Sequence, residues 1–213
     1  MKLNKESNSY IIIYSTILVV IVAFLLAFVS QTLKQQQDNN VALDTRKQIL
    51  YSLNLRDTVA TLSDSQINEL YEKVITQTDS VDDEKGKQRS YVYHANLNGE
   101  VKYVLPLKGQ GMWGGISAFL AIDSDKNTVY GAYFNHESET AGLGAEIKDN
   151  TQWQQKFQGK KIFSAPETLA LSVEKNVNNE TTVDAVTGAT VTSTAVSVML
   201  QEQLGKYMDF LKQ

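Results

Sequence analysis

An uncharged, strongly apolar stretch near the N-terminus limits what this chain can fold into. Residues 10–30 read YIIIYSTILVVIVAFLLAFVS, and no charged residue occurs between residues 7 and 33. About 20 apolar residues are enough for a helix to cross the hydrocarbon core of a bilayer. A cleaved signal peptide is the alternative, but this apolar region is too long for one and no clear small-x-small cleavage site follows it. The stretch therefore predicts a retained transmembrane helix.

The charges around this helix favour a cytoplasmic N-terminus only weakly. Lys2 and Lys5 precede the helix, whereas Lys34 follows it at once and Arg46 and Lys47 come soon after. Positive charge is enriched on the cytoplasmic side of membrane helices, and here it is spread over both ends. The apolar stretch holds no Asp, Glu, Lys, Arg or His. A path for ions needs such groups at membrane depth, so this helix alone provides none.

After the anchor, roughly 175 residues remain, which is enough for one domain with its own core. Residues 34–40 (KQQQDNN) are polar and predict either an exit linker or a helix that continues out of the membrane. The expected parts are a cytoplasmic tail (1–9), a transmembrane helix (10–30), a linker and helical stalk (31–62) and a single soluble domain (63–213).

The soluble part alternates helical and strand patterns in an α+β order. Asn98-Gly99 between two alternating apolar runs is a strong signal for a β-hairpin. We therefore expect an antiparallel sheet followed by a C-terminal helix. The expected helices are residues 41–55, 63–75, 151–157 and 192–211, the expected strands are residues 91–97, 101–107, 116–122, 128–134 and 169–173, and residues 78–89 are an expected loop.

The composition excludes several kinds of site. The chain has no cysteine, which rules out disulfides, thiolate nucleophiles, iron–sulfur ligation and c-type haem attachment. It has 2 histidines, which do not stand at metal-ligand spacing. The net charge of −4 gives no electrostatic footprint for nucleic acid.

The first chemical motif is DAVTGATVTS at residues 184–193. Thr187, Gly188 and Ala189 lead into the closing helix, so Thr190 is expected at or just before its first turn. Free N–H groups and the helix dipole favour an anion there, Gly188 lets a phosphate come close to the backbone, and Thr192 adds a hydroxyl donor. The alternative is an ordinary helix N-cap, since Thr and Ser are favoured caps.

Two further segments suggest a ligand site. HESETAGLG at residues 136–144 leaves the end of an expected strand as a glycine-punctuated loop. Thr140 could bond the edge of a flat ring and Leu143 could cover its face, whereas the alternative is a plain surface loop. GQGMWGG at residues 109–115 places Trp113 between glycines. It could cover a planar ring, although a tryptophan there is more often a core anchor.

Together these residues resemble the FMN-binding domain family, and within it the C subunits of sodium-translocating NADH:quinone oxidoreductases. The family motif is [Ser/Thr]-Gly-Ala-Thr-x-[Ser/Thr] with an upstream Asp, which here is Asp184 followed by residues 187–192. The family's Glu-Thr-Pro-Gly-Leu-Gly loop matches Glu139 to Gly144, with Ala141 in place of the proline. The Trp113 stretch and the Trp153 region also match, so the resemblance runs from the anchor to the last helix.

The resemblance implies that FMN is bound covalently by a phosphoester to Thr190. It also implies a separate flavin transferase, which takes the FMN moiety from FAD with Mg²⁺ and releases AMP, because a threonine hydroxyl alone is a weak nucleophile. Asp184 would either help the transferase or serve as a structural turn residue. Electron transfer needs no general acid or base, so no catalytic residue is expected.

The resemblance further implies a component of a bacterial inner-membrane complex that oxidises NADH and reduces quinone, with its soluble domain on the extracytoplasmic side. The other membrane, flavin and iron–sulfur subunits would be its partners. No G-x-G-x-x-G fingerprint for NADH follows a strand in this chain. Two alternatives stay open: the related flavin subunit of the Rnf ferredoxin:NAD complex, and a non-redox anchored sensor that holds a soluble phosphate ligand.

Overall fold

The computed structural model describes residues 7–82, 89–165 and 168–212. The chain divides into two compact units, Met1–Asp44 and Thr45–Gln213. Helix α1 (Asn8–Ser52) begins in the first unit and ends in the second. Most of the expected tail at residues 1–9 lies outside the described residues.

The first unit is the membrane anchor. Within the described residues, α1 is the one helix long and apolar enough to cross a bilayer, and none of its apolar segment is buried in protein. The helix continues through residues 34–40, so the polar segment is a helical continuation and not a flexible linker. The chain is therefore a membrane-anchored protein. The exact boundaries of its parts stay a prediction.

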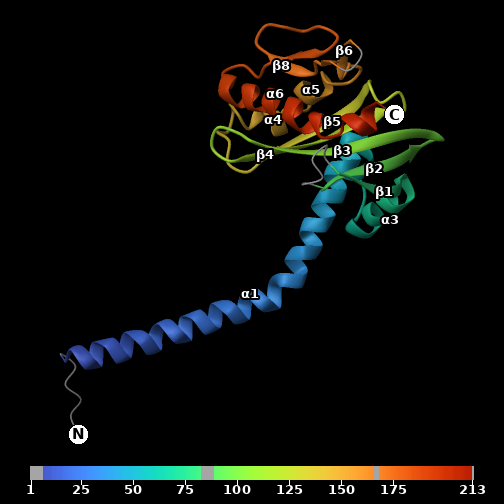
Figure 1. Ribbon diagram of the computed structural model, residues 1–213. Coiled ribbons are helices and arrows are strands. Elements are labelled where there is room, and N and C mark those ends of the chain that lie inside the picture. The colour runs from blue at the N-terminus through green and yellow to red at the C-terminus, as the bar shows by residue number, and fades with distance from the viewer. Residues whose placement is uncertain (1–6, 83–88, 166–167, 213) are drawn as a thin grey trace. The chain divides into compact units, whose positions relative to one another are not determined.

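The second unit is built on a five-stranded antiparallel sheet (Figure 1). Its strands lie in sequence order, and they are β1 (Ile75–Asp82), β2 (Arg89–Leu97), β3 (Glu100–Gln110), β4 (Gly115–Asp123) and β5 (Val129–His136). The expected hairpin at Asn98-Gly99 joins β2 to β3, where both turn residues have positive φ and the Gly99 N–H donates to Asn96 Oδ1 at 2.9 Å. The expected α+β fold is confirmed.

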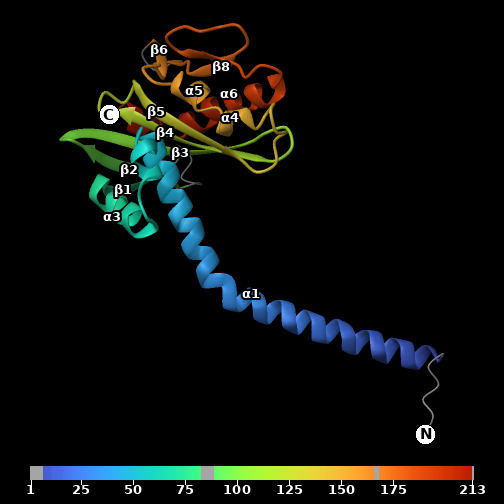
Figure 2. The ribbon, with the colours of Figure 1, turned by 180° about the vertical axis from the view of Figure 1, so that it is seen from behind.

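One face of the sheet is covered by three helices, as two opposite views show (Figures 1 and 2). These are α4 (Glu146–Asp149), α5 (Thr151–Gln155) and α6 (Thr190–Gly205). The main core lies in this layer, with Phe134, Trp153 and Phe157 packed at ring-centroid distances of 4.8–5.3 Å. This core holds α6 against the sheet, which positions the segment that precedes it.

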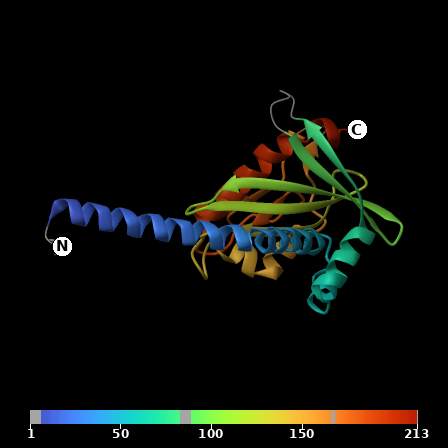
Figure 3. The same cartoon turned by 90° about the horizontal axis from the view of Figure 1, so that it is seen from below.

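The opposite face is covered by the end of α1, where Tyr51 packs on Tyr133 of β5, and by α3 (Asp64–Val74), which contacts β1 and β2. The short helix α2 (Arg56–Ala60) lies between α1 and α3 in the sequence. Ile49 and Leu50 of α1 are fully buried here. Ser63 is the N-cap of α3, and its N–H donates to Gln66 Oε1 at 2.9 Å. Figure 3 shows α3 running directly into β1.

Four sequence expectations about elements are wrong in extent. The separate helix expected at residues 41–55 is the end of α1, which runs without a break from Asn8 to Ser52. The loop expected at residues 78–89 is strand β1 as far as Asp82 and strand β2 from Arg89. The sequence pattern did not reveal β1, because an edge strand with exposed polar side chains lacks the apolar alternation that marks a strand. The strand expected at residues 169–173 is split into β7 (Thr168–Leu169) and β8 (Ser172–Glu174). The helix expected at residues 192–211 begins at Thr190 and breaks after Gly205.

The remaining short elements complete the layer that contains α6. They are β6 (Phe163–Ala165), which pairs with β7, β9 (Thr182–Asp184), which pairs in parallel with β8, and α7 (Met208–Leu211). Strand β9 leads directly into the turn before α6. This route brings Thr187, Gly188 and Thr190 of the motif at residues 184–193 to the surface.

Candidate functional site

The site is centred on Thr190, the first residue of α6. Its side chain is exposed, and the N-cap position is taken by Ala189, which makes no side-chain capping bond. The first N–H groups of a helix have no partner within the helix, and here no side chain at the N-cap accepts from them. The ordinary N-cap alternative is therefore wrong for this segment, and the helix start is open to an anion.

A short turn with a buried serine fixes the direction in which α6 begins. The Ala189 N–H donates to the Val186 carbonyl at 3.1 Å, and the buried Val186 N–H donates to Ser193 Oγ at 3.1 Å. Thr187 and Gly188 form the exposed tip, where Gly188 has φ +78°. Such a backbone is strained for any side chain, so glycine is required at this tip.

Glu139 joins this turn to two other segments of the chain. Its buried carboxylate accepts from the Thr192 hydroxyl at 2.5 Å and from the Trp113 N–H at 2.9 Å. Its own N–H donates to His136 Nδ1 at 3.2 Å. One carboxylate thus holds together the start of α6, the loop after β3 and the loop after β5.

The environment of Glu139 keeps its carboxylate charged. Burial by itself raises the pKa of Glu139, but hydrogen bonds from Thr192 and from the N–H groups of Trp113 and Met112, together with nearby His136, bring that pKa below its ordinary value. Bonds to the charged form of a carboxylate outweigh desolvation in such a site. A fixed negative charge therefore lies beneath the start of α6.

The loop at residues 137–144 packs closely on the turn before α6. A Cβ atom at Gly188 would lie 3.0 Å from Leu143 Cδ2, and one at Gly144 would lie 2.6 Å from Thr192 Oγ1. The exposed Thr140 directs its carbonyl to the N–H groups of Leu143 and Ala145, at 3.1 and 3.0 Å. The structure thus brings the two predicted motifs into one site.

Large apolar side chains are exposed on the three segments that Glu139 joins. Trp113 is 64% exposed, Val191 55%, Met112 51% and Leu143 43%. The core-anchor alternative for Trp113 is wrong, because the tryptophan that fills the core is Trp153. Exposed apolar clusters of this kind mark ligand or partner sites.

Asp184 has a structural position in β9. Its Oδ1 accepts from the Asn176 N–H at 2.8 Å, and its carbonyl accepts from Trp153 Nε1 at 2.8 Å. These bonds tie the turn after β8 to the strand that feeds the Thr190 segment. The hydrogen bond that the structure gives its carboxylate does not involve Thr190.

The sequence interpretation left Met112, Val191 and His136 out of the candidate site, and it took Ser193 as a hydroxyl donor to a phosphate, whereas Ser193 Oγ accepts from the Val186 N–H. Ser193 follows Thr190 by three positions, which is the spacing that can return a hydroxyl to the turn before a helix. Met112 and Val191 are direct neighbours of predicted site residues, and this adjacency was an available signal. His136 gave no signal, because its bond to the Glu139 N–H depends on how the loop folds.

Comparison with known proteins agrees with this geometry. The family model described as FMN-binding domain matches residues 111–205. The C subunit of the Na⁺-translocating NADH-quinone reductase of Haemophilus ducreyi is 31% identical to this chain, over 92% of this chain and 89% of that relative. This chain belongs to the family of these C subunits.

Solved structures of this C-subunit family share the fold. The C subunit from Parabacteroides distasonis has a TM-score of 0.77 at 34% identity, and the match covers 85% of this chain and 98% of that one. NqrC from Shewanella oneidensis has a TM-score of 0.65 at 19% identity, covering 79% of this chain and 96% of that one, which supports the fold alone.

Proposed function

We propose that this chain carries FMN on Thr190 and works as an electron-transfer subunit of a sodium-translocating NADH–quinone reductase. The observation that carries the proposal is an exposed threonine at a helix start whose N-cap makes no side-chain bond, with exposed apolar side chains on the segments that pack on this helix start. Membership of the C-subunit family supports the choice of FMN and of the complex.

The residues present fit a phosphate-linked flat cofactor. The phosphate would lie against the free N–H groups at the start of α6, where the helix dipole favours negative charge. The side chains of Trp113, Met112, Leu143 and Val191 offer apolar surface for a ring system. Thr187, Gly188 and Ala189 would hold the backbone close to the phosphate, and the exposed Thr140 would bond the ring edge.

The covalent bond would join Thr190 Oγ1 to the phosphorus of the FMN moiety of FAD, with AMP as the leaving group and the hydroxyl proton released. A separate flavin transferase with Mg²⁺ would catalyse this step, because the described residues place no general base within hydrogen-bonding distance of the Thr190 hydroxyl. When bound, FMN supplies the redox chemistry of the protein.

The surrounding residues have positioning roles. Glu139 and Thr192 fix the start of α6 relative to the loop that carries Trp113, and Gly144 leaves room for this contact. Asp184 fixes the strand before the turn. The apolar segment of α1 supplies no ion ligands, so sodium would cross the membrane through other subunits of the complex.

The mass of the denatured polypeptide tests the proposal. Full-length chain from a host with a working flavin transferase should be heavier by one FMN less one water, and should fluoresce on a denaturing gel. Thr190→Ala should lose both signals, whereas Thr194→Ala should keep them, since Thr194 is also exposed and its hydroxyl donates to the Thr190 carbonyl at 3.0 Å. Unmodified mass in the wild-type chain would contradict the proposal and favour a non-redox ligand-binding domain.

A further inference from the structure

The buried carboxylate of Glu139 gives the candidate flavin site a fixed negative charge. It accepts from the Thr192 hydroxyl at 2.5 Å and from the Trp113 N–H at 2.9 Å, and such bonds favour the charged form. The pKa of Glu139 lies below its ordinary value because of these bonds, so the carboxylate is ionised at neutral pH. The attachment of FMN to Thr190 does not by itself need this charge.

The groups around Glu139 stabilise its charge without cancelling it. A hydroxyl and two backbone N–H groups lower its pKa, and no lysine or arginine is among the groups that do so. His136 attracts the carboxylate electrostatically only while the imidazole is protonated. Its Nδ1 accepts the Glu139 N–H at 3.2 Å, as the neutral ring does. The carboxylate therefore acts on its surroundings as an uncompensated negative charge.

The charge lies close to the surface on which a flavin ring would rest. Trp113, whose N–H bonds the carboxylate, has a side chain that is 64% exposed. Thr192 follows Thr190 by two positions, about 3 Å along the helix axis. A Cβ atom at Gly144 would lie 2.5 Å from Glu139 Oε2, so the backbone of the loop closes directly on the carboxylate. Water and salt screen a charge in such a place much less than a charge at the surface.

A negative charge in this position opposes reduction of a flavin. Two electrons and one proton add one negative charge to the ring system. At an effective dielectric constant of about 20, a unit charge roughly 10 Å away lowers the equilibrium constant for such a step by about tenfold or more. A tenfold change corresponds to about 30 mV for a two-electron couple. The structure therefore contains a charge of sufficient strength to set the potential of the site.

We propose that the Glu139 charge lowers the reduction potential of FMN held on Thr190 and so makes the reduced subunit a stronger electron donor. The inference rests on the proposed function, because it needs FMN at this position. Glu139 acts on the ring through space, so it is not a catalytic residue. Its role goes beyond holding three segments together, since a neutral side chain of the same shape could not replace it.

Variants of the full-length chain, loaded in a host with a flavin transferase, separate charge from shape. Glu139→Gln keeps the shape and removes the charge, whereas Glu139→Asp keeps the charge and shortens the side chain. Redox titrations at about pH 8, where histidine is normally neutral, should show the reduction equilibrium shifted towards reduced FMN by about tenfold or more in Glu139→Gln. Glu139→Asp should shift it by less than about threefold. No shift in Glu139→Gln, or an equal shift in both variants, would overturn the proposal.

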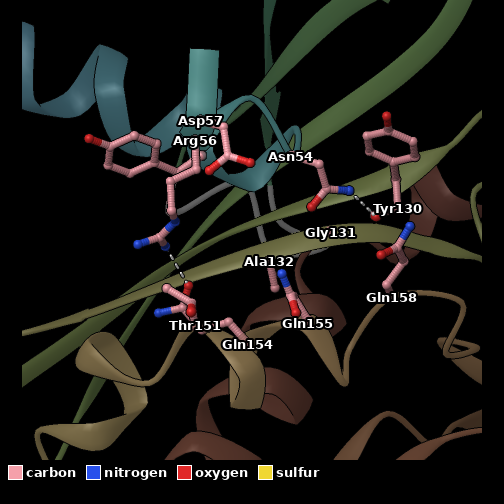
Figure 4. A pocket seen from close by; sticks show the side chains of 11 residues that line it. Asn54, Arg56, Asp57, Tyr130, Gly131, Ala132, Thr151, Gln154, Gln155 and Gln158 are labelled. Atoms are coloured by element: carbon pink, nitrogen blue, oxygen red, sulfur yellow. Dashed lines mark hydrogen bonds between the residues drawn. The ribbon is translucent and has the colours of Figure 1, made fainter. Parts of the chain in front are cut away.

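Two exposed carboxylates provide matched controls. Glu137→Gln removes the same charge at the surface, two residues away in the same loop. Asp57→Asn removes it at a separate polar pocket, which Asp57 lines together with Arg56 (Figure 4). Both controls should shift the equilibrium by less than about threefold, because water and salt screen exposed charges. A shift in either control as large as that in Glu139→Gln would overturn the proposal, since the net charge of the chain would then set the potential.

A second measurement does not depend on a charge-free variant that folds. The infrared difference spectrum between oxidised and reduced FMN is recorded on wild-type chain with ¹³C-labelled glutamate. The band of an ionised glutamate should shift on reduction, and Glu139→Asp should lack this signal. Absence of the signal from fully loaded wild-type chain would overturn the proposal.

Intact mass separates failure of this inference from failure of the flavin assignment. The mass of FMN on Thr190 is measured for every chain before its potential is determined. Unmodified mass in the wild-type chain would count against the flavin assignment. A loaded chain whose potential does not respond to Glu139→Gln would count against the role of Glu139 alone.

Discussion

At the scale of single residues, Glu139 has the largest effect on the site. Its carboxylate is buried and accepts hydrogen bonds from segments that are 26 and 53 positions away in the chain. Loss of a charged acceptor leaves its buried donors without a partner, and this lowers the free energy of unfolding more than loss of a surface contact does.

Glu139→Gln should lower the free energy of unfolding by about 2 kcal/mol at pH 7, because a neutral amide is a weaker acceptor for Thr192 and Trp113. The lowered pKa of Glu139 in the folded chain sets the pH dependence. The stabilisation that the charged Glu139 carboxylate contributes is fully present above the ordinary Glu pKa of about 4.3. It is lost as the pH falls through the lower pKa of Glu139 in the folded chain. Urea unfolding in detergent, followed by tryptophan fluorescence, should show the difference between variant and wild type narrowing below about pH 4.

The exposed neighbour Glu137→Gln is the control for this measurement. Its Oε2 accepts from the Gly115 N–H at 3.1 Å at the surface, so its effect should stay below about 0.5 kcal/mol. If the difference in free energy of unfolding between Glu139→Gln and wild type stayed constant from pH 7 to pH 3, the negative charge of Glu139 would not be what stabilises the site.

Gly188 and Gly142 form a matched pair at the same scale. Both have positive φ, +78° and +72°, but a Cβ at Gly188 would press on Leu143 whereas one at Gly142 would meet nothing within 4 Å. Gly142→Ala should therefore cost about 1 kcal/mol of stability, and Gly188→Ala roughly twice that. Gly188→Ala should also reduce the fraction of chain that carries FMN by intact mass. Equal effects of the two substitutions on both readouts would mean that the contact with Leu143 is unimportant.

At the scale of elements, the attachment of α6 decides whether the site exists. Ser193 accepts the buried Val186 N–H, whereas the neighbouring Thr194 makes its bond on the exposed side of the helix. Ser193→Ala should lower the free energy of unfolding by about 1–3 kcal/mol because it leaves that N–H without an acceptor. Thr194→Ala should change it by less than about 0.5 kcal/mol. Urea unfolding of both variants measures this difference. Similar free energies of unfolding would show that the buried hydrogen bond between Ser193 and Val186 does not hold α6 in place.

The sequence predicted elements where local signals agree with the fold. The Asn98-Gly99 turn and the alternation on either side of it locate β2 and β3, and the Gly188-Ala189-Thr190 unit indicates a helix start, although the helix begins at Thr190 and not at the expected residue 192. Strand β1 was missed because a polar edge strand has no apolar alternation.

The candidate site was predictable in its members but not in its contacts. Glu139 and Thr192 were both expected through resemblance, yet their hydrogen bond depends on how the sheet and α6 pack, which no local pattern encodes. The exposure of Trp113 depends on Trp153 filling the core instead, so it also required the tertiary structure.

At the scale of the whole molecule, the feature to test is the side of the membrane on which the second unit lies. We expect the extracytoplasmic side, with the N-terminal end in the cytoplasm. The chain has no cysteine, so single substitutions such as Asn8→Cys and Lys175→Cys can be labelled without background. A membrane-impermeant maleimide should label Lys175→Cys in intact cells and Asn8→Cys only after permeabilisation. The reverse pattern would place the globular unit in the cytoplasm.

The carboxylate that joins three distant segments also has a consequence for maturation. A ribosome releases the loop with Trp113 first, then Glu139, and the start of α6 last, so the geometry around Thr190 cannot form until the start of α6 has been synthesised and has folded onto the other two segments. Any enzyme that recognises this geometry acts only after these three segments have folded together. Modification at this position would then serve as a chemical record that these segments have assembled.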